Sequence, residues 1–115
     1  MKLQKLISKL EKHHKKKLDL SLGRTFNLLK KLGDPQDKLK NVITVVGTNA
    51  KASMCYSLKS ILNQGGYKTN LYTSPHLLSY TERYVFEDKE INEEDLIELL
   101  IDVEKTLGDD NATLF

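Results

Sequence analysis

The feature of this sequence that most constrains its fold is a run of β-branched residues that ends abruptly at a glycine. Residues 42–46 read Val-Ile-Thr-Val-Val, and Gly47 follows directly. Nearly every residue of the run is apolar, a pattern typical of a strand buried on both faces in a parallel sheet. Beyond a polar turn, apolar residues at helical spacing predict a helix over 51–64, ended by Gly65-Gly66. The stretch therefore predicts the strand, tight loop and helix of an α/β fold.

The turn between this strand and this helix has the composition of a phosphate-binding loop. It reads Gly47-Thr48-Asn49-Ala50-Lys51-Ala52-Ser53. Backbone N–H groups at a helix N-terminus bind phosphate, a lysine adds a point charge, and a serine hydroxyl can hold Mg²⁺. Alanine stands at positions 50 and 52, where such a loop is expected to have glycine, and Ala50 would cost roughly 1–2 kcal/mol in a left-handed conformation. A strand–turn–helix junction with an incidental lysine and serine is the alternative reading of the pattern.

A second strand is predicted over residues 67–72, followed by the polar turn Thr73-Ser74-Pro75-His76. A strand–helix–strand unit has a right-handed crossover, and its two parallel strands open at one edge of the sheet. Ligands of such sheets bind at the carboxyl ends of the strands. The topology therefore predicts that this turn and the loop 47–53 lie at the same edge.

Two further helices frame this unit in the sequence. Residues 1–17 are predicted to form a basic amphipathic helix, with Leu3, Leu6, Ile7 and Leu10 on its apolar face, and residues 93–107 form a second periodic segment. A shorter helix around Phe26 is predicted to end at Gly33. Residues 1–40 carry a net charge of +8 and residues 41–115 a net charge of −6. The basic half is either a solvated helix face or a surface for anionic partners.

Several classes of protein do not fit the composition. The single cysteine, Cys55, excludes an internal disulfide and suits a reducing cytoplasm. One cysteine and three scattered histidines give no zinc-binding spacing. The sequence also contains neither an apolar stretch of about 18 residues nor the apolar segment of a signal peptide.

Several strings follow one another in a fixed order along the chain: Leu32-Gly33-Asp34-Pro35-Gln36, the strand and loop over 43–53, Gly65-Gly66-Tyr67, Thr73-Ser74-Pro75-His76-Leu77 and Glu82-Arg83. In this order they resemble the folylpolyglutamate synthase/dihydrofolate synthase family of the Mur ligase superfamily. The string over 73–77 is the most specific, because related Mur ligases share the phosphate loop but not usually this string. The resemblance covers about residues 18–115. It implies a partial P-loop-type, mostly parallel sheet flanked by helices, the amino-terminal part of a Mur ligase ATP-binding domain, preceded by the helix over 1–17.

This resemblance implies an ATP-dependent amide ligase. In that reaction ATP phosphorylates a carboxylate of dihydropteroate or of a folate, and the amine of free L-glutamate then displaces phosphate from the acyl phosphate. Residues 47–53 would cradle ATP, with Lys51 as the catalytic lysine on its terminal phosphates. Ser53 and Ser74 would hold Mg²⁺, and Ser74, Pro75, His76, Leu77 and Arg83 would bind the pterin-bearing substrate. Two roles are open for Arg83, a substrate contact or a structural ion pair with Glu82.

The family further implies a cytoplasmic monomer that acts on small molecules, with neither nucleic acid nor membrane as a partner. Two features depart from the family pattern: glycine stands in the family at the positions of Ala50 and Ala52, and family members are several times longer than this sequence. The sequence is therefore expected to be an amino-terminal fragment that is inactive alone. The alternatives are another P-loop nucleotide-binding protein, such as a small kinase, and a non-enzymatic basic binding module centred on residues 1–40.

Overall fold

The computed structural model describes residues 2–13 and 22–108. The chain divides into two compact units, one formed by Met1–Val42 with Glu94–Phe115 and the other by Ile43–Glu93. The predicted boundary after residue 17 lies outside the described residues and stays a prediction.

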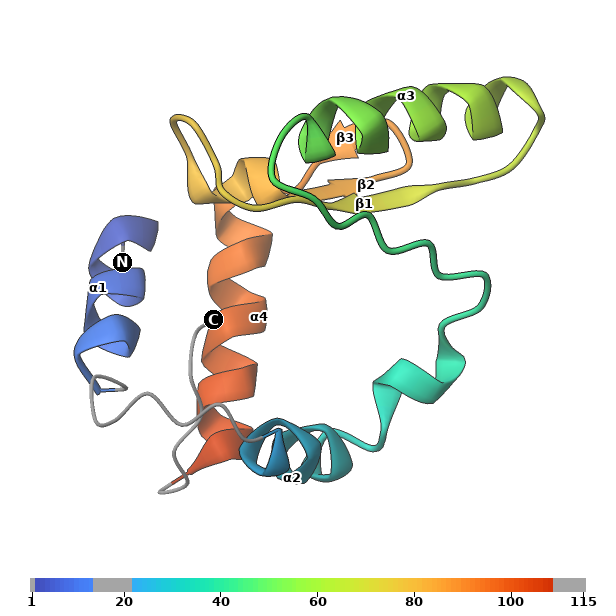
Figure 1. Cartoon of the computed structure of the whole chain (residues 1–115). Coiled ribbons are helices and arrows are strands. Elements are labelled where there is room, and N and C mark those ends of the chain that lie inside the picture. The colour runs from blue at the N-terminus through green and yellow to red at the C-terminus, as the bar shows by residue number, and fades with distance from the viewer. Residues whose placement is uncertain (1, 14–21, 109–115) are drawn as a thin grey trace. The chain divides into compact units, whose positions relative to one another are not determined.

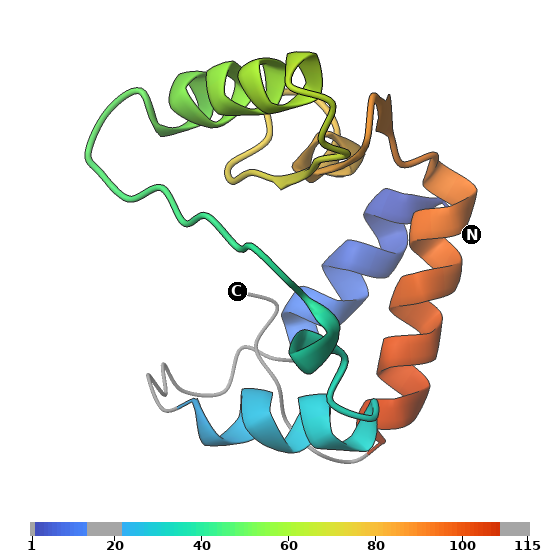
Figure 2. The same cartoon turned by 90° about the vertical axis from the view of Figure 1, so that its right-hand side faces the viewer.

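The first unit is helical. It contains α1 (Leu3–His13), α2 (Gly23–Lys31), the short 3₁₀ helix η1 (Pro35–Lys38) and nearly all of α4 (Glu93–Leu107). Figures 1 and 2 show α1 and α4 side by side, and the Nζ of Lys9 lies 2.9 Å from the Oε1 of Glu104 between them. The predicted apolar face of α1 is confirmed, since Leu3, Leu6, Ile7 and Leu10 are all buried.

Two helices end at glycines, as the sequence predicts. Gly33 after α2 has a φ of 80°, and Gly66 after α3 (Lys51–Gln64) has a φ of 86°. In both places the residue after the glycine donates its N–H to the carbonyl five residues back, at 2.9 and 3.0 Å. This is the Schellman ending, which requires a left-handed residue and therefore favours glycine.

The second unit contains α3, a three-stranded sheet and one short helix. The strands are β1 (Asn70–Tyr72), β2 (Tyr84–Phe86) and β3 (Lys89–Glu90), and the 3₁₀ helix η2 (Tyr80–Arg83) immediately precedes β2. The sheet order is β1-β2-β3 and both pairs are antiparallel, with Leu71 opposite Val85 and Val85 opposite Glu90.

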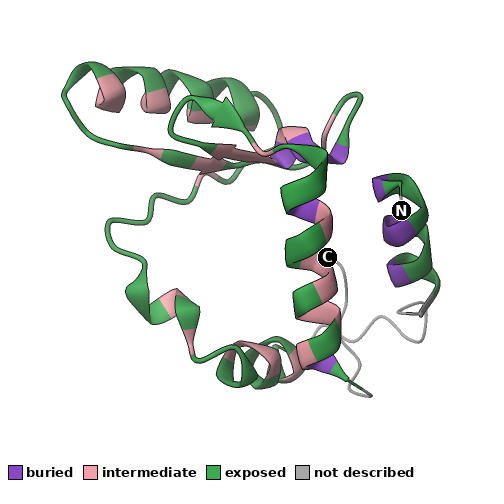
Figure 3. Ribbon diagram, turned by 180° about the vertical axis from the view of Figure 1, so that it is seen from behind, coloured by how far each residue is buried: buried purple, intermediate pink, exposed green. Residues whose placement is uncertain are grey.

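The sheet differs from the predicted one. Residues 42–47 belong to neither helix nor strand, and most of the run is exposed, Val46 to 84%; Figure 3 shows this segment largely in the exposed colour. A strand exists only through hydrogen bonds to a neighbouring strand, and no strand of the described residues pairs with this run. The second predicted strand is shorter than expected, 70–72, and pairs antiparallel with β2. The described residues therefore form no parallel sheet.

Helix α3 packs against β1, and the tight turn at Gly65-Gly66 reverses the chain between them. The chain leaves β1 at the end of this layer where α3 begins, as Figure 1 shows. Side chains also link α3 to the turn between β2 and β3. Lys59 of α3 reaches the carboxylate of Asp88 at 2.9 Å, and Asn63 reaches the same oxygen at 3.1 Å. The loop before α3 and the loop after β1 thus belong to one compact unit.

Candidate functional site

The first part of the candidate site is the loop that leads into α3. Ala50 is the N-cap residue of this helix and has φ 58° and ψ 17°, a left-handed conformation. A residue with a Cβ pays roughly 1–2 kcal/mol there relative to glycine. Ala50 therefore has the left-handed conformation in which the sequence predicted an energetic cost for alanine. Ala52 lies inside the helix.

The N-terminus of α3 presents polar groups suited to an anion. No side chain caps the first turn, and that turn contains no acidic residue. The unused backbone N–H groups and the helix dipole therefore give this end a partial positive charge. The Nζ of Lys51 donates a hydrogen bond to the carbonyl oxygen of Gly47 at 2.7 Å, which holds the ammonium group over the loop. An ammonium has three donors, so two remain for a ligand.

The other predicted residues of this loop face solvent. Thr48, Asn49, Ala52 and Ser53 are exposed and Lys51 is half-buried. The Ser53 carbonyl accepts a bond from the Ser57 hydroxyl at 2.9 Å, a bond that leaves the Ser53 hydroxyl itself uncommitted. The loop therefore combines a helix N-terminus, an ammonium and a hydroxyl, which are the groups that bind phosphate and its metal.

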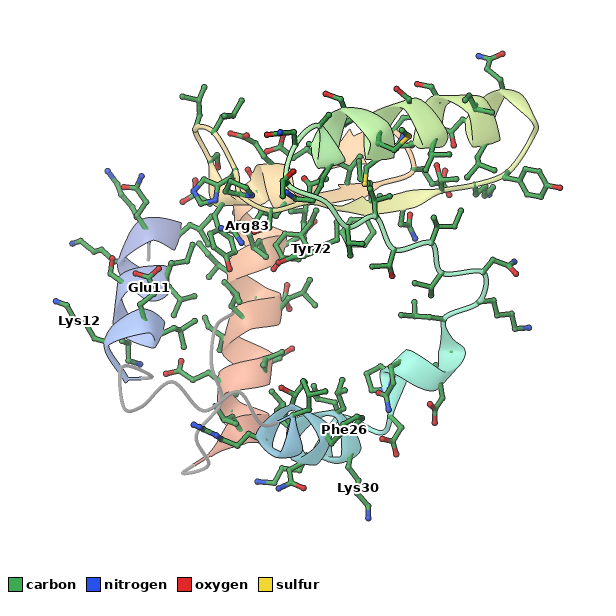
Figure 4. The ribbon with its side chains drawn as sticks, in the orientation of Figure 1. Glu11, Lys12, Phe26, Lys30, Tyr72 and Arg83 are labelled. Atoms are coloured by element: carbon green, nitrogen blue, oxygen red, sulfur yellow. The ribbon has the colours of Figure 1, made fainter. Side chains whose placement is uncertain are left out.

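The second part of the candidate site is the loop after β1, where Ser74 and Pro75 are joined by a cis peptide bond. Arg83, labelled in Figure 4, connects two of the predicted residues of this loop. Its Nε donates to the Nδ1 of His76 at 2.9 Å, and its Nη1 donates to the Oγ of Ser74 at 3.2 Å. The guanidinium also lies over the ring of Tyr80, 4.5 Å from its centre. The structure thus brings Ser74, His76 and Arg83 together, while Leu77 is 90% exposed.

Glu82 fixes the tip of the same loop. Its carboxylate accepts the backbone N–H groups of Leu77 at 2.9 Å, Leu78 at 2.7 Å and Ser79 at 2.5 Å. These bonds, that from Leu77 first, lower the pKa of the Glu82 carboxyl below its usual value. The Ser79 side chain in turn accepts the N–H of Thr81, so Ser79 and Glu82 form a capping box at the start of η2.

Aromatic rings continue this cluster toward the sheet. The ring centres of Tyr72 and Tyr84, which are direct register partners on β1 and β2, are 5.3 Å apart. The ring centres of His76 and Tyr80 are also 5.3 Å apart. Burial first, and then the phenol of Tyr80, raise the pKa of Tyr84 to about 12.

Sequence reasoning missed the part played by Glu82, Ser79 and Tyr80. The string Ser79-Tyr80-Thr81-Glu82 has the spacing of a capping box, so this signal was present in the sequence. Nothing in the sequence pattern indicated that the same carboxylate would also accept Leu77 and Leu78.

Within residues 2–13 and 22–108, no three His, Cys, Asp or Glu side chains are grouped closely enough to hold a metal ion. None of the described helices is both long and apolar enough to cross a membrane.

Comparison with known proteins gives strong matches in sequence and in structure, although no protein-family model matches the chain. The dihydrofolate synthase/folylpolyglutamate synthase of Escherichia coli is 38% identical over 109 residues, which is 95% of this chain and 26% of that protein. The Haemophilus influenzae protein of the same name is 40% identical over 92 residues, 80% of this chain and 21% of that protein.

Solved structures of proteins with the same names also match this chain. The Yersinia pestis bifunctional folylpolyglutamate synthase/dihydrofolate synthase complexed with AMPPNP and Mn ion has a TM-score of 0.89 and 32% identity over 98% of this chain and 27% of that one. The E. coli FolC structure in complex with DHPP and ADP has a TM-score of 0.86 and 37% identity, again over 98% of this chain and 27% of that one.

The fold and the loop before α3 place the chain among α/β proteins with a Mur ligase-like fold. More narrowly, the chain is a relative of the folylpolyglutamate synthase/dihydrofolate synthase family. It spans about a quarter of the length of the E. coli and Yersinia relatives it matches.

Proposed function

We propose that this chain is the nucleotide-binding segment of an ATP-dependent ligase that joins L-glutamate to dihydropteroate or to a folate. The observation that carries the proposal is the similarity over 95% of the chain to the E. coli synthase, together with a phosphate-type loop at the N-terminus of α3. The matched structures, one in complex with DHPP and ADP and one complexed with AMPPNP and Mn ion, support a nucleotide, a divalent metal and a small-molecule substrate. The remaining three quarters of such a protein would supply the other parts of the reaction, so we expect this segment alone to bind nucleotide without ligating glutamate.

Each part of the proposed site has a physical task. The loop 47–53 offers N–H groups to the phosphate chain of ATP, and Lys51 places a positive charge beside its terminal phosphates. Ser53 and Ser74 offer hydroxyl oxygens to Mg²⁺, which prefers oxygen ligands and keeps several waters. When bound, the metal would neutralise charge on the phosphate oxygens. Pro75, His76 and Leu77 form the surface offered to the pterin-bearing substrate.

We also propose that residues 42–46 form the first strand of a parallel sheet that the rest of a longer chain would complete. We further propose that the protein is a cytoplasmic monomer that acts on small molecules. The free thiol of Cys55 suits that reducing compartment.

Two experiments test the function. In the first, titration of the 115-residue chain with Mg-ATP is followed by calorimetry, with Lys51→Ala expected to weaken binding at least tenfold through loss of a charged contact. Lys68→Ala removes the same charge from a side chain that is 85% exposed and belongs to neither loop, and it serves as the control. Equal affinity in the two variants would contradict the role of Lys51.

The second experiment measures ligation directly. This chain replaces the matching segment of the E. coli relative, and the chimera is assayed for glutamate addition to dihydropteroate. We expect ligation that Lys51→Ala abolishes. A folded chimera that binds nucleotide but ligates with undiminished rate after Lys51→Ala would overturn the assignment.

A further inference from the structure

Arg83 makes an unusual set of contacts for a residue expected to touch substrate. It is only 5% exposed, and its guanidinium is committed to His76, Ser74 and the face of Tyr80. A guanidinium presents its donors in one rigid plane. Two bonds from that plane therefore fix the Ser74 hydroxyl and the His76 ring relative to each other.

The bond to His76 also determines where that ring carries its proton. Arginine has no acceptor, so the Nδ1 of His76 must accept from Arg83 and cannot itself carry hydrogen. The neutral ring then has its proton on Nε2. Within the described part of the chain this Nε2 has no hydrogen-bond partner, and His76 is partly exposed. His76 thus presents an N–H donor on the side of its ring away from Arg83.

Glu82, the neighbouring residue, holds the other half of the same loop. It binds three consecutive backbone N–H groups at 2.9, 2.7 and 2.5 Å. The side chains of Leu77 and Leu78 are 90% and 91% exposed, so side-chain burial does not order this tip. The carboxylate is therefore the main constraint on its backbone.

We propose that Glu82 and Arg83 are positioning residues that together hold residues 74–79 in a binding conformation before any ligand arrives. Arg83 does not touch the substrate; it orients His76 so that Nε2–H donates to an anionic oxygen of the substrate, a carboxylate or acyl phosphate oxygen. The donation from the Nε2–H of His76 to the substrate rests on the proposed function, whereas the positioning of the loop by Glu82 and Arg83 does not.

The bond between Arg83 and His76 is tested by NMR on the ¹⁵N-labelled 115-residue chain. A hydrogen bond from nitrogen to nitrogen gives a measurable scalar coupling between its two nitrogens. We expect a coupling between the Arg83 Nε and the His76 Nδ1. Absence of this coupling in the folded, unmodified chain would overturn the assignment.

The role of Glu82 is tested by amide hydrogen exchange in the same sample. Leu77, Leu78 and Ser79 should exchange slowly for such an exposed loop, and Glu82→Gln should accelerate all three at least tenfold. Glu87→Gln is the matched control, because Glu87 is an exposed glutamate of the same unit whose carboxylate faces Lys68 at 3.8 Å. Fast exchange in the unmodified chain, or equal effects of the two variants, would contradict the proposal.

The effect on substrate is measured in the chimera with Arg83→Lys and Arg83→Gln. A lysine keeps the charge but cannot donate to Ser74 and His76 from one plane, so both variants should raise the KM for dihydropteroate about tenfold or more. Rescue by lysine would show that charge alone matters and would overturn the positioning role. Failure of nucleotide binding or of ligation would contradict the proposed function while leaving the coupling and exchange results intact.

Discussion

The ammonium of Lys51 lies 2.7 Å from the carbonyl oxygen of Gly47, so the first residue of α3 is tied back to the start of the loop that precedes it. Between these two residues the backbone turns through Ala50, whose φ is 58°. The loop therefore turns through a left-handed residue that carries a side chain which this conformation disfavours.

The two alanines that flank Lys51 should respond to glycine in opposite ways. Ala50→Gly relieves the left-handed strain and should raise the free energy of unfolding by about 1 kcal/mol. Ala52→Gly lies within the helix and should lower it by up to about 1 kcal/mol. Urea unfolding of both variants measures the difference, and each variant is the control for the other. A loss of stability in Ala50→Gly would show that the turn is not left-handed at this position.

The hold of Glu82 on the loop should depend on pH. The pKa of the Glu82 carboxyl is lowered in the folded chain. The stability that the ionised carboxylate gives the loop is therefore present above the pKa of the unfolded chain, and it is lost as the pH falls through the lowered pKa. Amide exchange of Leu77, Leu78 and Ser79, corrected for intrinsic rates, should therefore lose its protection only on the acid side. Protection that does not fall as the pH is lowered, or that remains in Glu82→Gln, would assign it to another group.

Tyr84 should ionise only at strongly alkaline pH. Its pKa is raised to about 12, chiefly by burial, so the folded chain keeps the phenol protonated where an exposed tyrosine ionises near 10. The protonated phenol of Tyr84 therefore stabilises the folded state below a pH of about 10, and this stabilisation is lost as the pH rises from about 10 to about 12. Absorbance titration should show a late step that Tyr84→Phe removes.

The helices were predictable from sequence because their signals are local. The helix over 51–64 and the helix over 93–107 are found with the expected bounds, since apolar spacing and terminal glycines lie within the segments themselves. The strand over 42–46 did not form, because a strand depends on a partner elsewhere in the chain and local sequence does not show whether that partner is present.

The candidate site also has parts that local sequence predicts and parts that it does not. The loop 47–53 and the turn at 73–76 could be located from composition, because glycine, lysine and hydroxyl residues follow apolar segments there. The bonds of Arg83 to Ser74 and His76 span nine and seven residues and depend on how the chain folds back through η2. Sequence alone left the role of Arg83 open between a substrate contact and an ion pair with Glu82, and it did not indicate these two bonds.

The exposed run over 42–46 gives a last prediction, which tests the proposed parallel sheet. Val46 is 84% exposed in this chain, so Val46→Thr, which keeps the shape but adds a hydroxyl, should change the stability of the 115-residue chain by less than about 0.5 kcal/mol. In the chimera with the E. coli relative, the proposal buries this residue between two neighbouring strands. Burying a hydroxyl without a partner costs about 1–3 kcal/mol, so the same substitution should lower the chimera's free energy of unfolding by that amount. Urea unfolding of the four proteins makes the comparison, with the chain serving as the control for the chimera. A small effect in both would mean that the run stays exposed in the longer protein and forms no strand of a central sheet.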